Sequence, residues 1–401
     1  MTFVDEAAAL APSLISLRRQ LHRDPEVGLD LPRTRKRVLD ALAGLPLELT
    51  TSDTDGSVVA VISGTAPTDD RHCVFLRGDM DALPVREETG LDYAATDTAM
   101  HACGHDLHTA MLAGAAMLLS SHRERLAGDV VLLFQPGEEG FNGAARMIEA
   151  GALDASPAPA VAAYALHVTS ARFGNGVFAT RPGPLMAASD ILRVTVRGRG
   201  GHASAPHETL DPIPVAAEMI TALQTIVTRT IDTFHPVVVT VGTFRGGIRE
   251  NVISDDAEFS AAVRTFDPGI RETLISKLTT LCQGIATAHG LHADVEWERL
   301  YPVTANDPAE ATFLLQTVSA LLGEDATEVM ETPMTGSEDF SRILQRIPGA
   351  LAFLGATPKD ADPRTADFNH SAHAVFDDSV LPRGAAVLAE LARARLAAAR
   401  G

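Results

Sequence analysis

Two stretches of the chain carry residue types that bind metal ions. The first, with a cysteine two residues before a histidine, is His101-Ala-Cys-Gly-His-Asp-Leu-His108, and the second is Gln135-Pro-Gly-Glu-Glu-Gly140. Thiolate, imidazole and carboxylate are the ligands that a borderline-soft cation such as zinc takes, and a catalytic site leaves one position open for water. Cys103, His105 and the pair Glu138 and Glu139 therefore predict a catalytic metal centre.

The two adjacent glutamates are expected to divide two tasks. A metal ion lowers the pKa of a bound water molecule, and a carboxylate that is not a ligand must accept and relay the released proton. Neighbouring side chains on a loop point in different directions, so one glutamate can bind metal while the other handles protons. A structural reading stays open for each residue, since a lone cysteine is most often a small buried hydrophobe. The occurrence of all four residues within about forty positions favours a metal centre over these structural roles.

Length and charge narrow the classes of function. The 401 residues, 46% of them hydrophobic, predict two domains. Acidic residues outnumber basic ones by 52 to 33, and the net charge of −19 disfavours nucleic acid or an anionic membrane as a partner. The N-terminal segment lacks the features of a signal peptide, and no apolar run reaches the length of a membrane span. We expect a soluble, cytoplasmic protein with three reduced cysteines.

Short apolar runs predict the buried strands of an α/β sheet in the first part of the chain. These runs cover residues 58–62, 73–76, 130–134 and 161–166, with helical patterns near the N-terminus and over 107–119. Polar motifs follow three of the runs, at Arg77 to Asp81, at Gln135 to Gly140 and at His167. Because α/β sheets build their sites at the ends of strands, we expect these motifs to lie together.

The pattern changes from residue 188. Strands are expected over 191–197, 237–243, 257–264 and 293–297, with helices over 212–228 and 270–288. This order of strand, helix, strand, strand, helix and strand is that of an open-faced α+β sandwich. We therefore predict an inserted α+β domain over residues 187–299, between two parts of a catalytic domain over 1–186 and 300–401.

A series of ordered motifs extends over almost the whole chain. They are Arg77-Gly-Asp-Met-Asp-Ala-Leu-Pro84, His101-Ala-Cys-Gly-His-Asp106, Phe134-Gln-Pro-Gly-Glu-Glu139, Ala165-Leu-His167, Gly200-Gly-His-Ala-Ser-Ala-Pro206, Asn251-Val-Ile253, Gly336-Ser-Glu-Asp-Phe340 and Asn369-His-Ser371. In these motifs the chain resembles the two-metal aminoacylases and carboxypeptidases, in the branch of hippurate hydrolases, N-acyl-amino-acid amidohydrolases and indole-acetyl-amino-acid hydrolases. The resemblance implies a mixed-sheet α/β/α catalytic domain, and an inserted domain that acts as a lid and dimerisation domain.

The resemblance also implies a set of metal ligands. Two divalent ions would be bound by Cys103, His105, Glu139, His167 and His370, with Glu138 as the general base and acid. His373 competes with His370, which is preferred because it lies in the family's Asn-His-Ser segment. Zinc is favoured by the thiolate and imidazole ligands, while manganese, cobalt and nickel occupy similar sites.

Three carboxylates are candidates for orienting the ligand imidazoles. Asp81 matches the family's orienting aspartate best, and Asp79 and Asp106 are expected to play similar parts. By contrast, His101 and His108 are expected to pack or to support the loop.

The inserted domain carries residues that resemble the family's substrate-binding groups. His202 resembles the histidine that stabilises the oxyanion, which in dimeric relatives enters from the neighbouring subunit. Asn251 and Arg264 resemble the groups that hold the free carboxylate of the substrate, although a surface salt bridge is an alternative for Arg264. Gly336 resembles a substrate-pocket glycine, although a plain turn also fits. The resemblance also implies a homodimer formed through the inserted domain, where an edge strand could pair with a second copy.

These residues together predict an amidohydrolase that cleaves N-acyl-L-amino acids into a carboxylic acid and a free amino acid. A metal-dependent dipeptidase or carboxypeptidase is the alternative. True peptidases of the wider group usually carry a His-x-Asp ligand where this chain has Asp79, which favours acyl amino acids. A non-catalytic metal-binding scaffold is disfavoured, because every ligand position and Glu138 are filled.

Overall fold

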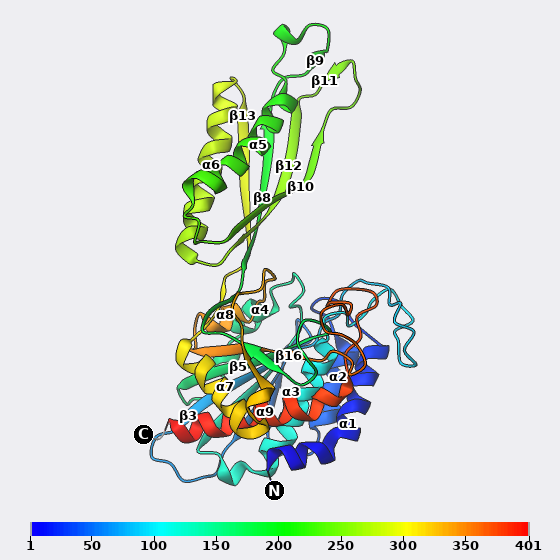
Figure 1. Cartoon of the computed structure of the whole chain (residues 1–401), viewed down its shortest axis with the longest axis vertical. Coiled ribbons are helices and arrows are strands. Elements are labelled where there is room, and N and C mark those ends of the chain that lie inside the picture. The colour runs from blue at the N-terminus through cyan, green and yellow to red at the C-terminus, as the bar shows by residue number, and fades with distance from the viewer. Residues whose placement is uncertain (1, 400–401) are drawn as a thin grey trace. The chain divides into compact units, whose positions relative to one another are not determined.

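The computed structural model describes residues 2–399, which divide into two compact units (Figure 1). The first unit contains the chain up to Leu185, Ala305–Thr332 and the chain from Asp339 onward. The second unit contains Met186–Thr304 and the short segment Pro333–Glu338. The sequence pattern places this short segment in the catalytic domain, because a six-residue loop carries no periodic pattern of its own.

The first unit is built on an eight-stranded mixed sheet in the order β1-β2-β4-β3-β5-β16-β6-β15. The strands are β1 Glu48–Thr51, β2 Val58–Ser63, β3 His72–Asp79, β4 Gly128–Gln135, β5 Ala160–Thr169, β6 Phe178–Thr180, β15 Thr327–Val329 and β16 Gly349–Gly355. β3 runs parallel to β4 and β5, and β5 runs parallel to β16, so the carboxyl ends of these four strands lie at one edge. The predicted mixed-sheet α/β fold is therefore confirmed.

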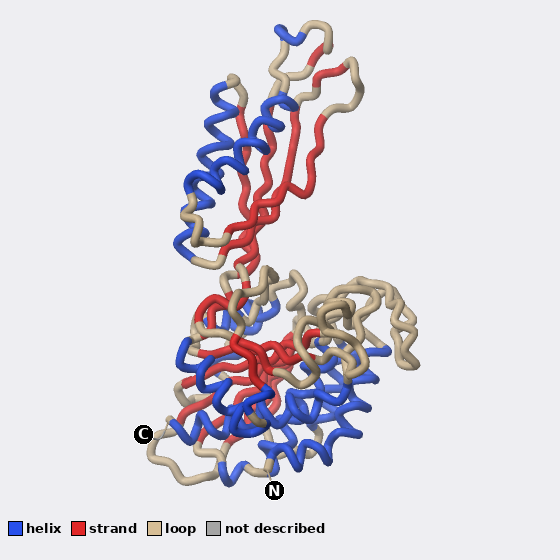
Figure 2. Tube along the Cα trace, viewed as in Figure 1, coloured by secondary structure: helices blue, strands red, loops and turns tan. Residues whose placement is uncertain are grey.

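Helices cover this sheet with apolar surface (Figure 2). They are α1 Phe3–Arg23, α2 Pro32–Leu42, α3 His105–Ser121, α4 Gly143–Glu149, α7 Pro308–Leu322, α8 Ser341–Leu344 and α9 Leu381–Ala398. A capping box of Thr2 and Asp5 starts α1. α3 packs between α1 and α9 and is buried on nearly all sides, as its apolar composition requires.

The second unit is a four-stranded antiparallel sheet in the order β10-β12-β8-β13. Its strands are β8 Ala188–Arg197, β10 Val237–Gly246, β12 Asp256–Thr265 and β13 His292–Tyr301, and its helices are α5 Pro212–Thr230 and α6 Pro268–Ala288. Alternate residues of β8 and β12 are buried in the apolar core shared with α5 and α6. A ribbon of β9 Gly201–His202 and β11 Val252–Ile253 extends the unit.

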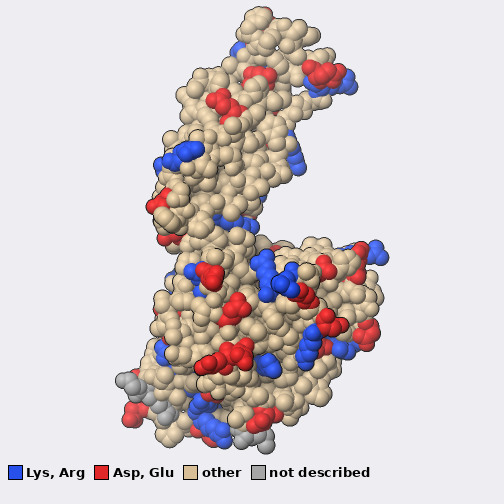
Figure 3. Space-filling model, in the orientation of Figure 1, with Lys and Arg blue, Asp and Glu red and all other residues tan. Residues whose placement is uncertain are grey.

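The chain passes between the two units at β7 Gly183–Met186 and β14 Thr304–Asn306, and again on either side of Pro333–Glu338. Basic and acidic side chains are interspersed in small groups on the face seen in Figure 3. On the sheet of the second unit, for example, Arg197 pairs with Asp294 at 2.9 Å and with Asp256 at 3.3 Å. Among residues 2–399, no helix has both the length and the apolar character needed to cross a membrane.

A buried arginine on α1 ties the N-terminal helix to the start of α3. Nε of Arg18 lies 2.8 Å from Oδ2 of Asp106, and Nη1 donates to the Tyr93 hydroxyl at 2.7 Å. Nη1 also lies 3.2 Å from Oδ1 of Asp378, in the turn before α9. His22, one turn further along α1, contacts the same Asp106 oxygen at 2.8 Å. The start of α3 is therefore fixed by charge as well as by apolar packing.

We predict that Arg18→Met lowers the free energy of unfolding by about 3–5 kcal/mol, because it removes one partner of a buried ion pair. The matched control is Arg19→Met. Arg19 contacts the same Asp378 at 2.8 Å, but its side chain is 38% exposed. This change is expected to cost no more than about 1 kcal/mol. Urea unfolding of the two variants measures the difference, and equal losses would contradict the prediction.

Candidate metal centre

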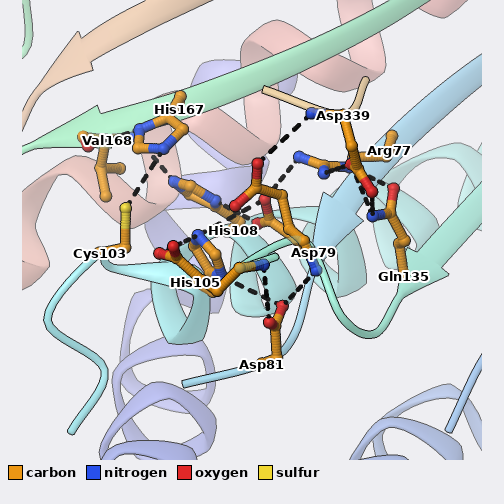
Figure 4. Close-up of polar contacts among 12 residues, drawn as sticks. Arg77, Asp79, Asp81, Cys103, His105, His108, Gln135, His167, Val168 and Asp339 are labelled. Atoms are coloured by element: carbon orange, nitrogen blue, oxygen red, sulfur yellow. Dashed lines mark hydrogen bonds and ion pairs between the residues drawn. The ribbon is translucent and has the colours of Figure 1, made fainter. Parts of the chain in front are cut away.

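Polar side chains gather at the carboxyl edge of the large sheet (Figure 4). Asp79 ends β3 and Asp81 follows it, while Glu138 and Glu139 come just after β4. His167 lies near the end of β5. Because β3, β4 and β5 are parallel, their ends bring these side chains to one place, as the sequence predicted.

Cys103 and His105 flank the glycine at which α3 begins. Gly104 is the N-cap and has a φ of 82°, the left-handed region that glycine favours. A Cβ at this position would lie 2.3 Å from Cγ2 of Val168, so no larger residue fits. The tight turn places the thiol and the imidazole side by side.

The five predicted ligands lie close together. Sγ of Cys103 lies 3.5 Å from Nε2 of His167 and 3.2 Å from Nε2 of His370. Oε1 of Glu139 lies 3.2 Å from Nε2 of His370 and 3.9 Å from Nε2 of His105. In the groups Cys103/His105/His167 and Cys103/Glu139/His370, the potential ligand atoms all lie within 4.8 Å of one another. Metal–ligand bonds of roughly 2.0–2.3 Å give ligand atoms that are spaced in this way.

Unpaired buried atoms support a cation at this place. His105 is fully buried, yet neither ring nitrogen makes a well-formed hydrogen bond with a residue that the structure describes. Buried polar atoms nearly always have a partner, so these atoms require one. Thiolate, imidazole and carboxylate donors together fit zinc and related divalent ions.

The surroundings of Cys103 favour its thiolate. Burial alone raises the pKa of a thiol, but His167 and His105 outweigh this effect and hold the pKa of Cys103 well below its usual value. Burial instead raises the pKa of Cys73 to about 11 and that of Cys282 to about 12. Because the thiolate is the form that binds metal, Cys103 is the cysteine prepared for ligation.

His370 is held in an unfavourable backbone conformation. Its φ is 74°, which for a residue other than glycine costs about 1–3 kcal/mol. Its N–H donates to the carbonyl of Ala102 at 2.8 Å. The amide of Asn369 donates to the carbonyl of Val168 at 3.0 Å, which ties the loop to β5. Both ring nitrogens of the rival His373 instead approach Glu88, with Nδ1 at 3.1 Å from the carbonyl oxygen and Nε2 at 3.4 Å from Oε2.

Two aspartates brace the ligands. The carboxylate of Asp81 accepts the N–H groups of Glu138 and Glu139, each at 3.0 Å. Its Oδ1 also lies 3.4 Å from Nδ1 of His105, so Asp81 is placed to orient this imidazole. Oδ1 of Asp79 lies 2.5 Å from Nδ1 of His108. Nε2 of His108 in turn accepts the N–H of Val168 at 2.7 Å, so this histidine supports the loop and strand around the ligands.

Asp106 does not contact the ligand imidazoles, in contrast to the sequence-based expectation. Its carboxylate binds Arg18 and His22 on α1 instead. Burial would raise the pKa of Asp106, but these two partners lower it below the usual range. Consecutive residues on a helix point about 100° apart, so a neighbour of His105 on α3 faces elsewhere.

The predicted substrate-binding residues all belong to the second unit. His202 on β9 pairs with Val252 on β11, and the N–H of Ala203 donates to the carbonyl of Asn251 at 3.2 Å, which brings His202 and Asn251 together. Arg264 on β12 instead donates to the hydroxyl of Ser189 on β8, and burial lowers its pKa. The carbonyl of Gly336 accepts the N–H of Ala187 at 2.9 Å.

His202 is exposed and has a defined tautomer. Its Nδ1 accepts the backbone N–H of Ser204 at 3.1 Å and lies 2.8 Å from the Ser204 hydroxyl. A backbone N–H can only donate, so Nδ1 carries no proton and the neutral ring carries its proton on Nε2. His202 therefore offers a hydrogen-bond donor at its outer nitrogen.

A two-unit α/β fold with this group of metal-binding side chains defines a metal-dependent hydrolase. The model of Peptidase family M20/M25/M40 matches residues 75–394, and the chain belongs to this family. The resemblance seen in the sequence motifs is thereby confirmed.

Relatives across this family act on amide bonds. The chain is 37% identical to a thermostable carboxypeptidase 1 of Saccharolobus solfataricus, over 94% of each chain. It is 36% identical to an N-acetyl-L-cysteine deacetylase of Bacillus subtilis, over 93% of this chain and 86% of the relative. It is 35% identical to a hippurate hydrolase of Campylobacter jejuni, over 98% and 99%.

Solved structures share the whole fold. A dinuclear metal-binding peptidase of the M20 family from Bacillus subtilis superimposes with a TM-score of 0.82 at 30% identity, over 97% of this chain and 99% of that chain. A structure from methicillin-resistant Staphylococcus aureus superimposes with a TM-score of 0.91 at 29% identity, over 98% and 99%. The arrangement of elements described above is therefore that of known members of the family.

We predict that Cys103→Ser lowers the affinity for divalent metal by at least about 10- to 100-fold, a loss seen even for residues that only support ligands. Equilibrium dialysis against cobalt or zinc, followed by metal analysis, measures the change. Cys282→Ser is the matched control, because Cys282 is a buried thiol on α6 in the other unit. An unchanged affinity in Cys103→Ser would remove this residue from the ligand set.

Proposed function

We propose that this chain is a dinuclear metal-dependent amidohydrolase that cleaves N-acyl-L-amino acids into a carboxylic acid and a free amino acid. The observation that carries the proposal is the placement of Glu138, whose carboxylate lies within 4.8 Å of the potential ligand atoms of His105 and Glu139. Proton transfer to and from the reacting groups requires a carboxylate that lies beside the metal ligands but is not itself a ligand. The deacetylase and hippurate hydrolase among the relatives support acyl amino acids as substrates.

Cys103, His105, Glu139, His167 and His370 would hold two divalent ions. When bound, these ions supply Lewis acidity toward the amide carbonyl and lower the pKa of water. Zinc is favoured by the donor set, with manganese, cobalt and nickel as alternatives. Glu138 takes the proton of the attacking water and passes it to the leaving amine. His202 donates from Nε2 to the carbonyl oxygen as negative charge develops there.

The carboxylate of the amino-acid product has its own proposed partners. Asn251 and Arg264 bind it, since a guanidinium donates two parallel hydrogen bonds to a carboxylate. The half-buried position of Arg264 on β12 supports this role, because burial strengthens a charged hydrogen bond. Gly336 lets the substrate approach the backbone.

A carboxypeptidase or dipeptidase activity is the second candidate. The observation in its favour is the 37% identity to a thermostable carboxypeptidase. The chemistry at the scissile amide is the same, and the two activities differ in the group that precedes this bond. A panel of acetyl-, benzoyl- and indole-acetyl-amino acids beside dipeptides separates them, and preference for dipeptides would reverse the ranking.

The proposal extends to assembly and location. The second unit supports a homodimer, because β10 is an edge strand of its sheet and carries the partly exposed apolar residues Val238 and Phe244. The cytoplasmic location inferred from the sequence stays a prediction.

We predict that Glu138→Gln keeps both metal ions and lowers kcat by about 100- to 10,000-fold, because the amide cannot accept a proton. The assay uses protein stripped of metal and reloaded with zinc or manganese, with metal content measured on the same sample. Glu139→Gln is the matched control and is expected to lose metal together with activity. An active Glu138→Gln protein would refute the proton-transfer role.

We predict that Arg264→Lys lowers kcat/KM for N-acyl amino acids by about 10- to 100-fold, the worth of one charged bidentate hydrogen bond. Substrates whose carboxylate is converted to an amide are expected to react equally slowly with the variant and with the unchanged protein. Arg245→Lys, on the neighbouring strand β10, is the control and leaves kcat/KM unchanged. If Arg264→Lys is equally active on the free acid, Arg264 does not bind the carboxylate.

A further inference from the structure

A buried arginine on β3 joins two carboxylates that both approach the candidate centre. Arg77 is 2% exposed. Its Nη1 donates to Oδ2 of Asp79 at 2.5 Å and its Nη2 to Oδ1 of Asp339 at 2.9 Å (Figure 4). Its Nε donates to Oε1 of Gln135 at 2.9 Å. The rigid fork of a guanidinium fixes the directions of the groups that it binds.

Asp339 is held by several donors. It is fully buried, and Nε2 of Gln135 donates to its two oxygens at 2.8 Å and 2.9 Å. The N–H of Ala144, near the start of α4, donates to Oδ2 at 2.9 Å. Together with Arg77, these bonds fix Asp339 relative to the end of β4. A buried ion pair with this many bonds leaves its members little freedom to move.

The backbone of Asp339 in turn reaches Glu138. Its N–H donates to Oε1 of Glu138 at 3.4 Å. At this distance the contact is a long hydrogen bond. At its other end, Glu138 donates its own N–H to Asp81 at 3.0 Å. The glutamate is therefore held at its backbone by Asp81 and at its carboxylate by Asp339.

The other branch of the network leads to the ligands. Oδ2 of Asp79, which binds Arg77, lies 3.6 Å from Nε2 of His105. Arg77 thus lies between the residue that handles the proton and a residue of the ligand set. Asp339 contacts the first of these, whereas Asp79 approaches the second, so the two branches can be tested separately.

We propose that Arg77 and Asp339 are positioning residues, and that their ion pair holds the Glu138 carboxylate where proton transfer requires it. The inference rests on the proposed function, in which Glu138 moves the proton. A displacement of about 1 Å at a reacting group lowers the rate roughly 100-fold, so loss of the pair acts on turnover. Metal binding is left in place, because Asp339 is not among the five proposed ligands.

Asp339→Asn tests this inference, because it removes the charge that pairs with Arg77 and keeps the shape. Loaded with cobalt, the variant is expected to bind as many ions as the unchanged protein, with the same visible absorption. Its kcat is expected to fall at least about tenfold, while KM stays within about twofold. An unchanged kcat, or loss of cobalt together with activity, would overturn the inference.

Asp129→Asn is the matched control. Asp129 is also buried, binds Arg71 and accepts the Ser156 hydroxyl at 2.7 Å, but it lies at the amino end of β4. Its kcat and cobalt absorption are expected to match those of the unchanged protein.

Arg77→Lys provides a second test if the asparagine variant does not fold. Lysine keeps the charge but cannot serve all three acceptors in the same geometry, so kcat is again expected to fall. A folded Arg77→Lys variant with unchanged kcat would overturn the inference. Failure of the proposed function gives a different result, since the unchanged protein would then not hydrolyse N-acyl amino acids. If only the inference fails, the unchanged protein is active, Glu138→Gln is inactive and Asp339→Asn retains full kcat.

Discussion

The site at the carboxyl edge of the large sheet requires several acidic side chains to be buried away from water. Cys103, Asp79, Asp81 and Glu138 are all buried there, and Glu139 is partly buried. Burial disfavours each charged form, so every one of these groups needs compensation. The protein supplies it with the guanidinium of Arg77 and with backbone N–H groups directed at Asp81. The negative charge that these groups do not neutralise attracts divalent cations.

This balance explains local features that are otherwise unfavourable. The left-handed backbone of His370 has an energetic cost, yet it brings an imidazole to within 3.2 Å of the Cys103 sulfur. Cys103 also precedes the first turn of α3, where the unpaired N–H groups of a helix favour negative charge. The strained loop at His370 and the position of α3 therefore both stabilise negative charge at Cys103.

The sequence predicted the parts of the site that are local in the chain. Cys103, His105 and the acidic pair lie in short motifs whose spacing suffices to indicate a metal centre. His167 and His370 were reached only through family resemblance, because no local pattern connects either of them to Cys103. Asp106 was placed wrongly because adjacency along a helix does not mean adjacency in space. The link between Arg77 and Asp339 joins distant segments, and only the fold brings them together.

The division of the first unit along the chain affects how the protein is made. β16, the His370 loop and α9 are synthesised after the four-stranded sheet of the second unit is complete. Domains generally fold as units and in the order of synthesis, so the second unit can fold while the first is still incomplete. Until β16 arrives, β5 is an edge strand, and α3 lacks the apolar cover of α9. Until β16 and α9 are synthesised, the edge of β5 and the apolar face of α3 are therefore open to association with other chains.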